Sequence, residues 1–321
     1  MPSDTALAAA EASVLRTALG AYKHTAALRS GQVASALLRL KFADVSPVNR
    51  AFAPMVRDAR FDVCEMAIAT FLQAKAYGRP LVLLPVAVAA RFQEPALLCR
   101  VGSTIRGPAD LAGRRVGVRA YSQTTGMWLR GILAGDYGVR PEQVRWVTFE
   151  DAHVAEYREP PWAARAPTGA DMLAMLRAGD LDAVIVGNDL PDDPGLRTVF
   201  PHPVAAGEAF RRRHGFVPVN HLVTVRRELA EHRPDLVAEL LRMFRDARAA
   251  ASPDPGGDDP LPMGRTALQP ALALALRYSA EQGLLPRYLD IEEVWEGLPP
   301  ENRPGLAVMR EAVGDTLGMG Q

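Results

Sequence analysis

The chain has 321 residues, of which 48% are hydrophobic and 23% are charged, proportions typical of a globular protein. This length exceeds the usual size of a single hydrophobic core and favours two lobes. Basic and acidic residues number 37 each. This balance argues against nonspecific binding to nucleic acid or to a membrane surface, because both require an excess of positive charge.

Residues 1–16 are rich in alanine and lack the basic start and long apolar run of a secretory signal. No apolar run of the sequence reaches the roughly 18 residues that a membrane span needs. The two cysteines, Cys64 and Cys99, fall in segments expected to be buried, and no spacing typical of a zinc site occurs. We therefore expect a cytoplasmic protein that binds no metal.

The first hundred residues alternate between strand and helix patterns. The patterns predict strands at 15–19, 37–42, 61–63 and 81–89, and helices near 26, over 48–56 and from about 67 to Gly78. The run 81–89 is almost wholly apolar, as in a strand that is covered on both faces. Strands that alternate with helices predict a mostly parallel, doubly wound sheet.

The segment 110–128 carries the most informative local pattern. It begins Asp-Leu-Ala-Gly-Arg-Arg-Val-Gly-Val, which predicts a helical turn, a tight turn and a buried strand. A polar loop containing Ser122, Thr124 and Thr125 then enters a helix. A helix N-terminus carries roughly half a positive charge and unpaired N–H donors, so it suits a carboxylate or phosphate. Alternatively, one of these hydroxyls only caps the helix.

The remaining chain continues the alternation. Further strands are predicted at 144–149, 183–186 and 216–225, and helices at 171–177, 234–250, 267–280 and from 291. Residues 252–262, rich in Pro, Gly and Asp, predict a surface loop. Arg211 to His214 predict an exposed helix face. The apolar stretch 267–285 is either core or the face of a homodimer.

In this order the elements resemble the type II periplasmic-binding-protein fold, through 110–118 and through Gly-Asp-Leu-Asp-Ala at 179–183. The resemblance implies an α/β fold of two lobes, each with a mostly parallel doubly wound sheet and flanking helices. Residues 1–100 and 217–321 would form one lobe and 101–216 the other, with the ligand in the cleft between them.

Four segments are similar to the 4,5-dihydroxyphthalate decarboxylase family. They are Phe-Asp-Val-Cys-Glu-Met-Ala-Ile-Ala-Thr-Phe at 61–71, the stretch 116–133, Phe-Val-Pro-Val-Asn-His at 216–221 and Tyr-Ser-Ala-Glu-Gln-Gly-Leu at 278–284. The resemblance implies a cytoplasmic carboxy-lyase that uses no cofactor. It would remove CO2 from a small, hydroxylated, phthalate-type aromatic acid.

Several polar positions depart from the family's pattern. Its Arg-x-Phe-Arg-His-Ser run reads Ala-Arg-Phe-Gln-Glu-Pro at 90–95, and its Ser after Glu-Met is Ala67. Its Pro-Glu-Tyr-Gln-Met-Thr loop reads Arg-Ala-Tyr-Ser-Gln-Thr at 119–124, and its Asp-Tyr-Asp-Arg-Thr pattern reads Ala-Tyr-Lys-His-Thr at 21–25. The scaffold is thus kept while pocket positions change, which predicts a different substrate or a different reaction.

Ligands of open α/β sheets bind beyond the carboxyl ends of the strands, so the loops at these ends supply the candidate site. Glu65, His221 and His24 are the candidates for proton transfer. The candidates for substrate binding are Tyr22, Met66, Arg91, Phe92, Arg119, Tyr121, Gln123, Thr124, Thr125, Trp128, Asn188 and Asn220.

Decarboxylation assigns roles to these candidates. Arg119 or Arg91, with the helix start at Thr124 and Thr125, would hold the carboxylate that stays. An apolar wall would favour the loss of the other carboxylate, because its charge disappears more easily away from water. The candidates for this wall are Tyr121, Phe92, Met66 and Trp128.

Structural alternatives remain open for several of these residues. Glu65 could cap a helix or form a salt bridge, and His221 could be a core histidine. Trp128 could pack in the core, and Arg130 could be solvated or bridge the lobes. For the whole chain, the alternatives are a noncatalytic carboxylate-binding protein of the solute-receptor type and an enzyme of other chemistry.

Overall fold

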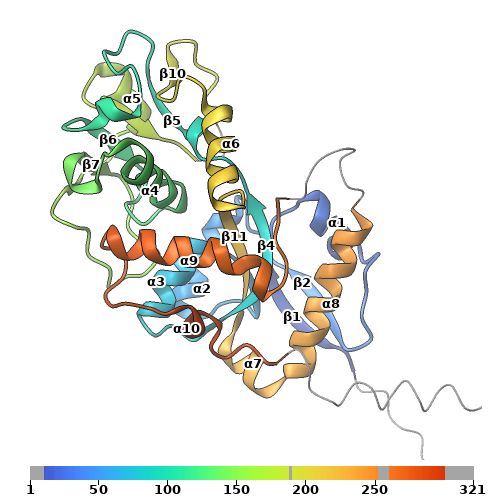
Figure 1. The fold of residues 1–321 in the computed structure, drawn as a ribbon. Helices are drawn as coiled ribbons and strands as arrows, with labels where there is room; N and C mark the ends of the chain where they lie inside the picture. Colours follow the sequence, from blue (N-terminus) through green and yellow to red (C-terminus); the bar gives the residue numbers. More distant parts are fainter. Residues whose placement is uncertain (1–10, 188–189, 252–259, 301–321) are drawn as a thin grey trace, which may run out of the picture.

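The computed structural model describes residues 11–187, 190–251 and 260–300, which form two lobes (Figure 1). The first lobe contains a five-stranded sheet in the order β2-β1-β3-β11-β4. Its strands are β1 (Ser13–Ala18), β2 (Leu38–Phe42), β3 (Val63–Ala67), β4 (Leu81–Ala90) and β11 (Val219–Arg226). Strand β1 is parallel to β2 and β3, whereas β11 is antiparallel to β3 and β4. Strands β1, β2, β3 and β4 therefore run in one direction, as predicted, and β11 runs against them because it enters the sheet from the second lobe.

The second lobe contains a six-stranded sheet in the order β10-β5-β9-β6-β7-β8. Its strands are β5 (Leu97–Arg100), β6 (Arg115–Val118), β7 (Arg145–Thr148), β8 (Ala163–Arg165), β9 (Ala183–Ile185) and β10 (Leu196–Thr198). The pairings among β6, β7, β8 and β9 are parallel, and β5 is antiparallel to β9 and β10. The sequence pattern predicted β6, β7 and β9 but missed β5, β8 and β10.

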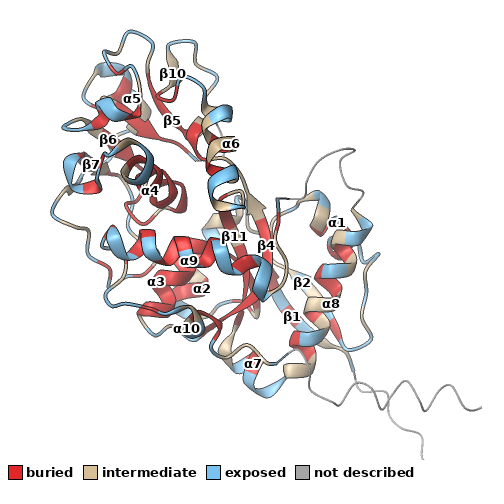
Figure 2. Cartoon of the chain, in the orientation of Figure 1, coloured by how far each residue is buried: buried red, intermediate tan, exposed pale blue. Residues whose placement is uncertain are grey.

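Helices flank both sheets. They are α1 (Ala26–Ser30), α2 (Phe52–Asp58), α3 (Ile68–Ala76), α4 (Thr124–Tyr137), α5 (Met172–Ala178), α6 (Pro203–His214), α7 (Arg227–His232), α8 (Pro234–Ala250), α9 (Arg265–Glu281) and α10 (Ile291–Trp295). The predicted helix at 234–250 is confirmed as α8, which buries one apolar face (Figure 2). Of α6 only its last turn was predicted, because the helix buries just Gly207 and Phe210.

The chain passes between the lobes twice, and the two passages lie side by side. The first follows β4 at 91–96 and the second precedes β11, and the Arg91 N–H donates to the Pro218 carbonyl at 3.1 Å. Because β5 already pairs with β9 and β10, the second lobe begins before residue 97, a few residues ahead of the predicted boundary.

Helix α9 packs against both α3 of the first lobe and α4 of the second (Figure 1). It buries Leu268, Ala271, Leu272, Leu274, Ala275, Leu276, Tyr278 and Ser279. The apolar stretch at 267–285 thus contributes to the core of this chain, and a homodimer stays a prediction. No helix among the described residues is long and apolar enough to cross a lipid bilayer.

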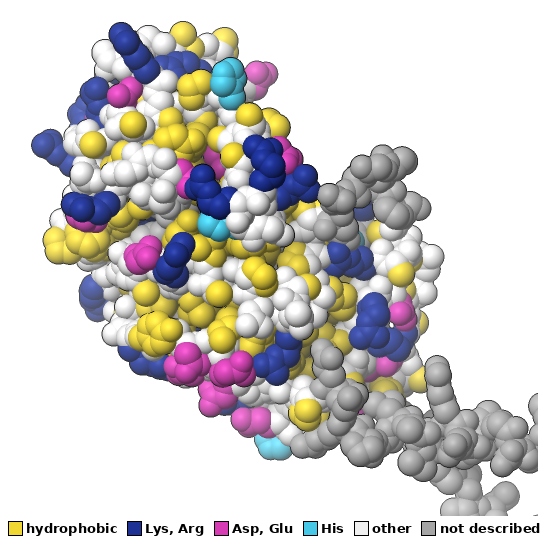
Figure 3. Space-filling model, viewed as in Figure 1, with side chains coloured by type: hydrophobic (Ala, Val, Ile, Leu, Met, Phe, Trp, Pro, Cys, Tyr) yellow, Lys and Arg dark blue, Asp and Glu magenta, His cyan; other side chains and the backbone are white. Residues whose placement is uncertain are grey.

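Both cysteines are buried and unpaired, as their segments indicated. Basic and acidic side chains are scattered over the face shown in Figure 3, in keeping with the zero net charge. The predicted loop at 252–262 falls mostly outside the described residues.

Candidate active site

A cavity of about 590 Å³ lies between the lobes, at the carboxyl ends of strands from both sheets. About half of its described lining residues are polar and the others are apolar, so it offers both hydrogen-bonding groups and apolar walls to a small molecule. From the first lobe these are Tyr22, Pro47, Val48, Asn49, Phe52, Ala67, Thr70, Asn220 and His221. From the second they are Arg119, Gln123, Thr124, Thr125, Phe149, Glu150, His153, Ala170, Asp171, Met172, Leu173, Ile185, Val186 and Gly187.

Glu65 lies behind the wall of this cavity, fully buried on β3. Its Oε1 accepts a hydrogen bond from the Tyr22 hydroxyl at 2.6 Å and lies 2.6 Å from Nδ1 of His221. Its Oε2 accepts from the Gly20 N–H at 2.8 Å. In the antiparallel pairing of β3 with β11, Glu65 lies opposite Val223, two residues from His221. This pairing brings an acid and a histidine that are 156 positions apart into direct contact.

The three donors keep Glu65 ionised. Burial alone would raise the pKa of its carboxyl, but the hydrogen bond and charge of His221 and the bonds from Tyr22 and Gly20 outweigh burial and hold this pKa below its usual value. Burial and the adjacent carboxylate raise the pKa of Tyr22 well above the usual value of a tyrosine, so the phenol stays protonated and donates. An ionised Glu65 accepts a hydrogen bond, so His221 must carry a proton on Nδ1. Nε2 is then the ring nitrogen that can exchange a proton with a ligand.

Local structure holds the Tyr22 loop in place. Thr25, which is buried, donates to the Gly20 carbonyl at 2.8 Å and accepts from the Tyr22 N–H at 2.9 Å. A Cβ at Gly20 would lie 2.6 Å from the Tyr22 ring, so only glycine allows this approach. His24 stacks on Tyr22 with ring centroids 5.2 Å apart, and its Nε2 lies 3.1 Å from the Val88 carbonyl oxygen.

Helix α4 points its N-terminus at the cavity. Gln123, Thr124 and Thr125 all line it, and their binding of an anion stays a prediction. Arg119 also lines the cavity, where its guanidinium lies 3.3 Å from the Glu150 carboxylate. Solvent reaches both partners, whose side chains are 32% and 55% exposed, which weakens this ion pair.

Arg91 approaches the same helix from behind. Its guanidinium donates to Thr125 Oγ1 at 3.1 Å and to the Gly187 carbonyl at 3.2 Å. It lines a second, smaller cavity of about 280 Å³ together with His24, and Tyr22, Asn220 and His221 form part of the walls of both cavities. The pairing of β11 with β4 is irregular at Val219–Val223, where two successive residues, Asn220 and His221, both line the cavities.

Four predicted substrate-binding residues lie elsewhere. Met66 is fully buried in the core, because successive residues of a strand point to opposite faces and Glu65 takes the other one. Tyr121 and Trp128 are also fully buried; the Trp128 indole donates to the Val219 carbonyl at 2.9 Å. Phe92 packs against Gly207 of α6. Another predicted substrate-binding residue, Asn188, lies outside the described residues.

Arg130 is buried, not solvated, and bridges the lobes. Its guanidinium donates to the Gln282 side chain at 2.8 Å and to the Tyr121 carbonyl at 2.6 Å, and it lies 3.9 Å from the centroid of the Tyr121 ring. Burial lowers the pKa of this group. It lines no part of the cavity between the lobes.

Sequence reasoning missed His153, which lines the cavity from the second lobe. Its Nδ1 lies 2.8 Å from Thr70 Oγ1 of α3, so this contact joins the lobes. Phe52 separates it from His221, with ring centroids 5.7 and 5.2 Å away. Burial and the nearby Arg119 and Arg57 lower its pKa to about 4. The position of His153 just after β7, at the carboxyl end of a parallel strand, was a usable signal.

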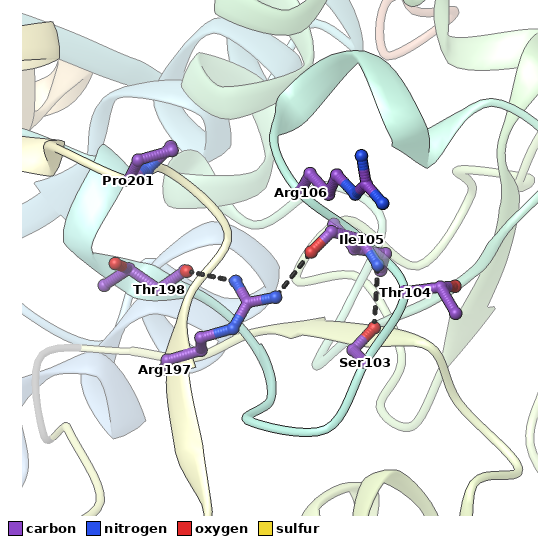
Figure 4. Close-up of a pocket in the computed structure, with 7 residues that line it drawn as sticks. All are labelled: Ser103, Thr104, Ile105, Arg106, Arg197, Thr198 and Pro201. Carbon is purple, nitrogen blue, oxygen red and sulfur yellow. Dashed lines mark hydrogen bonds between the residues drawn. The ribbon is translucent and has the colours of Figure 1, made fainter.

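Another hollow of about 630 Å³ lies on the second lobe, between the loop 103–106 and β10. There Arg197 donates to the carbonyls of Ile105 and Thr198 and thereby holds the loop (Figure 4). None of the described lining residues is a histidine or a carboxylic acid. Nor do three or more metal-binding side chains gather anywhere in the described part of the chain. The interlobe cavity, in contrast, is lined by His153 and His221, with Glu65 behind His221, and is the candidate for acid–base chemistry.

Comparison with known proteins adds two kinds of likeness, although no protein-family model matches the chain. A 4,5-dihydroxyphthalate decarboxylase from Comamonas testosteroni is 30% identical over 208 residues, which are 61% of this chain and 63% of that protein. A second protein of this name, from Pseudomonas putida, is 31% identical over 137 residues, 40% of this chain and 53% of that protein. The matched segment spans less than two thirds of either relative.

The fold is similar to that of the periplasmic aliphatic sulphonate binding protein SsuA from Escherichia coli, with a TM-score of 0.58 and 18% identity. The match covers 89% of this chain and 98% of that protein. Both resemblances drawn from the sequence are thus confirmed. The chain is similar to decarboxylases of this name, and it has the two-lobed α/β fold of periplasmic binding proteins.

Proposed function

We propose that this protein is a decarboxylase that acts on a small, hydroxylated aromatic carboxylic acid in the cavity between the lobes. The observation that carries the proposal is the buried Glu65 carboxylate, which holds His221 by one ring nitrogen at the cavity wall. The likeness to proteins named 4,5-dihydroxyphthalate decarboxylase supports the same reaction class.

In the proposed reaction His221 is the acid that protonates the ring. Its Nε2 gives a proton to the ring carbon that bears the carboxylate. The bond from this carbon to the carboxylate then breaks, its electron pair restores the aromatic ring, and CO2 leaves. One proton enters the product per turnover, so His221 must regain a proton from solvent. Glu65 compensates the charge of the imidazolium and fixes its orientation, as a positioning residue.

The other polar groups of the cavity would hold the substrate. The N-terminus of α4 binds a carboxylate through the N–H groups of Thr124 and Thr125. His153, neutral at pH 7 because its pKa is about 4, and its partner Thr70 exchange hydrogen bonds with a ring hydroxyl. Phe52 and Phe149 line the cavity as apolar surfaces for the ring.

A noncatalytic carboxylate-binding protein is the second candidate function. The observation that favours it is the similarity of the fold to SsuA, a binding protein. Under this alternative the pair of Glu65 and His221 would serve recognition alone. The sequence predicted a cytoplasmic protein, and this localisation goes with the decarboxylase. It stays a prediction.

The test is turnover. Purified protein is incubated with 4,5-dihydroxyphthalate and, separately, with 3,4-dihydroxybenzoate, and CO2 and the decarboxylated ring product are measured together. Release of both in equal amounts from either acid supports the decarboxylase. Saturable binding of these acids without CO2 contradicts it and favours the binding protein.

A further inference from the structure

We infer that the cavity selects an aromatic acid with a single carboxylate over a phthalate-type diacid. This inference rests on the proposed function, since it concerns the substrate of the same site. It is carried by the charges and hydrogen-bonding groups that the described lining residues bring to the cavity.

The cavity wall carries no excess of positive charge. Among its described lining residues, Arg119 is the one arginine, lysine is absent, and there are two carboxylic acids, Glu150 and Asp171. Arg119 is already paired with Glu150, at 3.3 Å. A ligand carboxylate placed near Arg119 would therefore meet a partly neutralised guanidinium in the presence of a second acid, Asp171. Such like-charge proximity weakens binding.

One place in the cavity does favour an anion. Thr124 and Thr125, at the N-terminus of α4, line it, and the Arg91 guanidinium donates to Thr125 Oγ1 at 3.1 Å. Arg91 itself lines the smaller cavity, so its charge reaches the ligand through Thr125 instead of by direct contact. The helix N-terminus and Arg91 thus act at the same point, which matches one carboxylate. In a monocarboxylic acid this carboxylate is the departing group, so the helix start does not have the role expected from the sequence, which was to hold a carboxylate that stays.

Apart from Tyr22 and the proton donor His221, the remaining polar side chains are neutral and suit hydroxyls. They are Asn49, Thr70, Gln123, His153 and Asn220. The Asn220 amide is itself held by Gln93, whose Nε2 donates to its Oδ1 at 2.9 Å, so this position offers a fixed neutral group rather than a cation. The complement of such a site is a ring with one carboxylate and one or more hydroxyls.

The experiment uses two ligands that differ by one carboxylate, 3,4-dihydroxybenzoate and 4,5-dihydroxyphthalate. Binding of each to the full chain is measured by calorimetry at pH 7, and ring products are followed by chromatography in the same samples. We expect the dihydroxybenzoate to bind at least about tenfold more tightly. Equal or tighter binding of the dihydroxyphthalate overturns the inference, and so does the absence of binding by both.

A matched pair of variants tests the cause. Asp171 caps α5 by accepting from the Ala174 N–H at 2.7 Å, and Asp290, which does not line the cavity, caps α10 by accepting from the Glu293 N–H at 2.8 Å. Asparagine caps a helix as well as aspartate does. Asp171→Asn should reduce the preference for the monocarboxylate by about threefold, whereas Asp290→Asn should leave it unchanged. An identical ratio in both variants contradicts the role given to the Asp171 charge.

Failure of the inference and failure of the proposed function give different results. Preferential binding of the dihydroxybenzoate without release of CO2 supports the single-carboxylate site and rejects the decarboxylase. Release of CO2 from a tightly bound dihydroxyphthalate supports the decarboxylase and rejects the single-carboxylate site.

Discussion

Glu65 is fully buried and yet ionised, because the donors of Tyr22, Gly20 and His221 surround its carboxylate. A buried charge with such partners is costly to disturb, since removal of one partner leaves the others without compensation. At the residue scale, the proposed chemistry depends on this cluster. It keeps the phenol of Tyr22 protonated and the imidazole of His221 in one orientation.

Glu65→Gln should therefore lower kcat by at least about 100-fold while KM changes little, because the amide cannot compensate an imidazolium. The rate that remains should also show a changed pH profile, as expected if Glu65 acts through His221. Glu94, another buried glutamate, whose pKa is raised by burial, provides the control. Steady-state kinetics of Glu94→Gln should match the parent protein. Unchanged kcat in Glu65→Gln would remove the proposed role.

His153 makes stability depend on pH. Its pKa in the folded protein is about 4, below the 6.5 of a free histidine, so between these values the unfolded chain binds the extra proton. The free energy of unfolding is therefore unaffected by this proton above pH 6.5. As the pH falls from 6.5 towards 4, it decreases by about 3 kcal/mol in all. Urea unfolding at several pH values should show this loss in the parent protein and a shallower slope in His153→Gln. His232→Gln, which changes an exposed histidine, serves as the control. An equal pH slope in the parent protein and in both variants would refute the assignment to His153.

At the scale of elements, helices α4 and α9 connect the lobes. Gly131 of α4 faces the ring of Tyr278 on α9, and Trp128 meets the same ring edge-on, with centroids 5.9 Å apart. Two residues after Trp128, Arg130 reaches across to Gln282. The contact is close because a glycine occupies the crossing point.

A matched pair of glycines on α4 tests this packing. A Cβ at Gly131 would lie 2.0 Å from the Tyr278 ring, whereas one at Gly135 would meet nothing nearer than the Tyr278 hydroxyl, at 3.8 Å. Gly131→Ala should lower the free energy of unfolding by about 1–3 kcal/mol through overpacking. Gly135→Ala should raise it by up to about 1 kcal/mol through helix propensity. Chemical denaturation measures both, and destabilisation of equal size in the two variants would contradict the close approach.

On the scale of the whole molecule, two passages of the chain and the α4–α9 contact join the lobes around the cavity. A ligand that touches both lobes favours the closed arrangement by the difference in its affinity for the two states. The His153–Thr70 contact already spans the cavity at one point. Closure must therefore pivot about packed helices and not about a free linker.

We expect saturating 3,4-dihydroxybenzoate to reduce the radius of gyration measured by small-angle scattering. An aromatic acid that calorimetry shows not to bind, added at the same concentration, provides the control for added ligand. Superimposable scattering profiles with and without a bound ligand would contradict closure of the lobes.

Local patterns in the sequence determined most elements of secondary structure, because burial with a period of two or 3.6 residues is written into neighbouring positions. The apolar run at 81–89 became β4, and the amphipathic stretch 234–250 became α8. The loop of Gln123, Thr124 and Thr125 was placed at a helix N-terminus by the same local reasoning, and it lines the cavity. Glu65 and His221 were selected because they lie at the carboxyl ends of strands in the fold that the resemblance implied.

Only the tertiary structure decided which side chains meet. The pairing of β3 with β11 joins Glu65 to His221 and sends Met66 into the core, and a short strand does not reveal which face is buried. The packing of α9 on α4 turned Trp128 and Arg130 inward, and the approach of the second lobe brought His153 to Thr70. These contacts join residues far apart in the chain, and they depend on strand register and helix crossing, which no local period encodes.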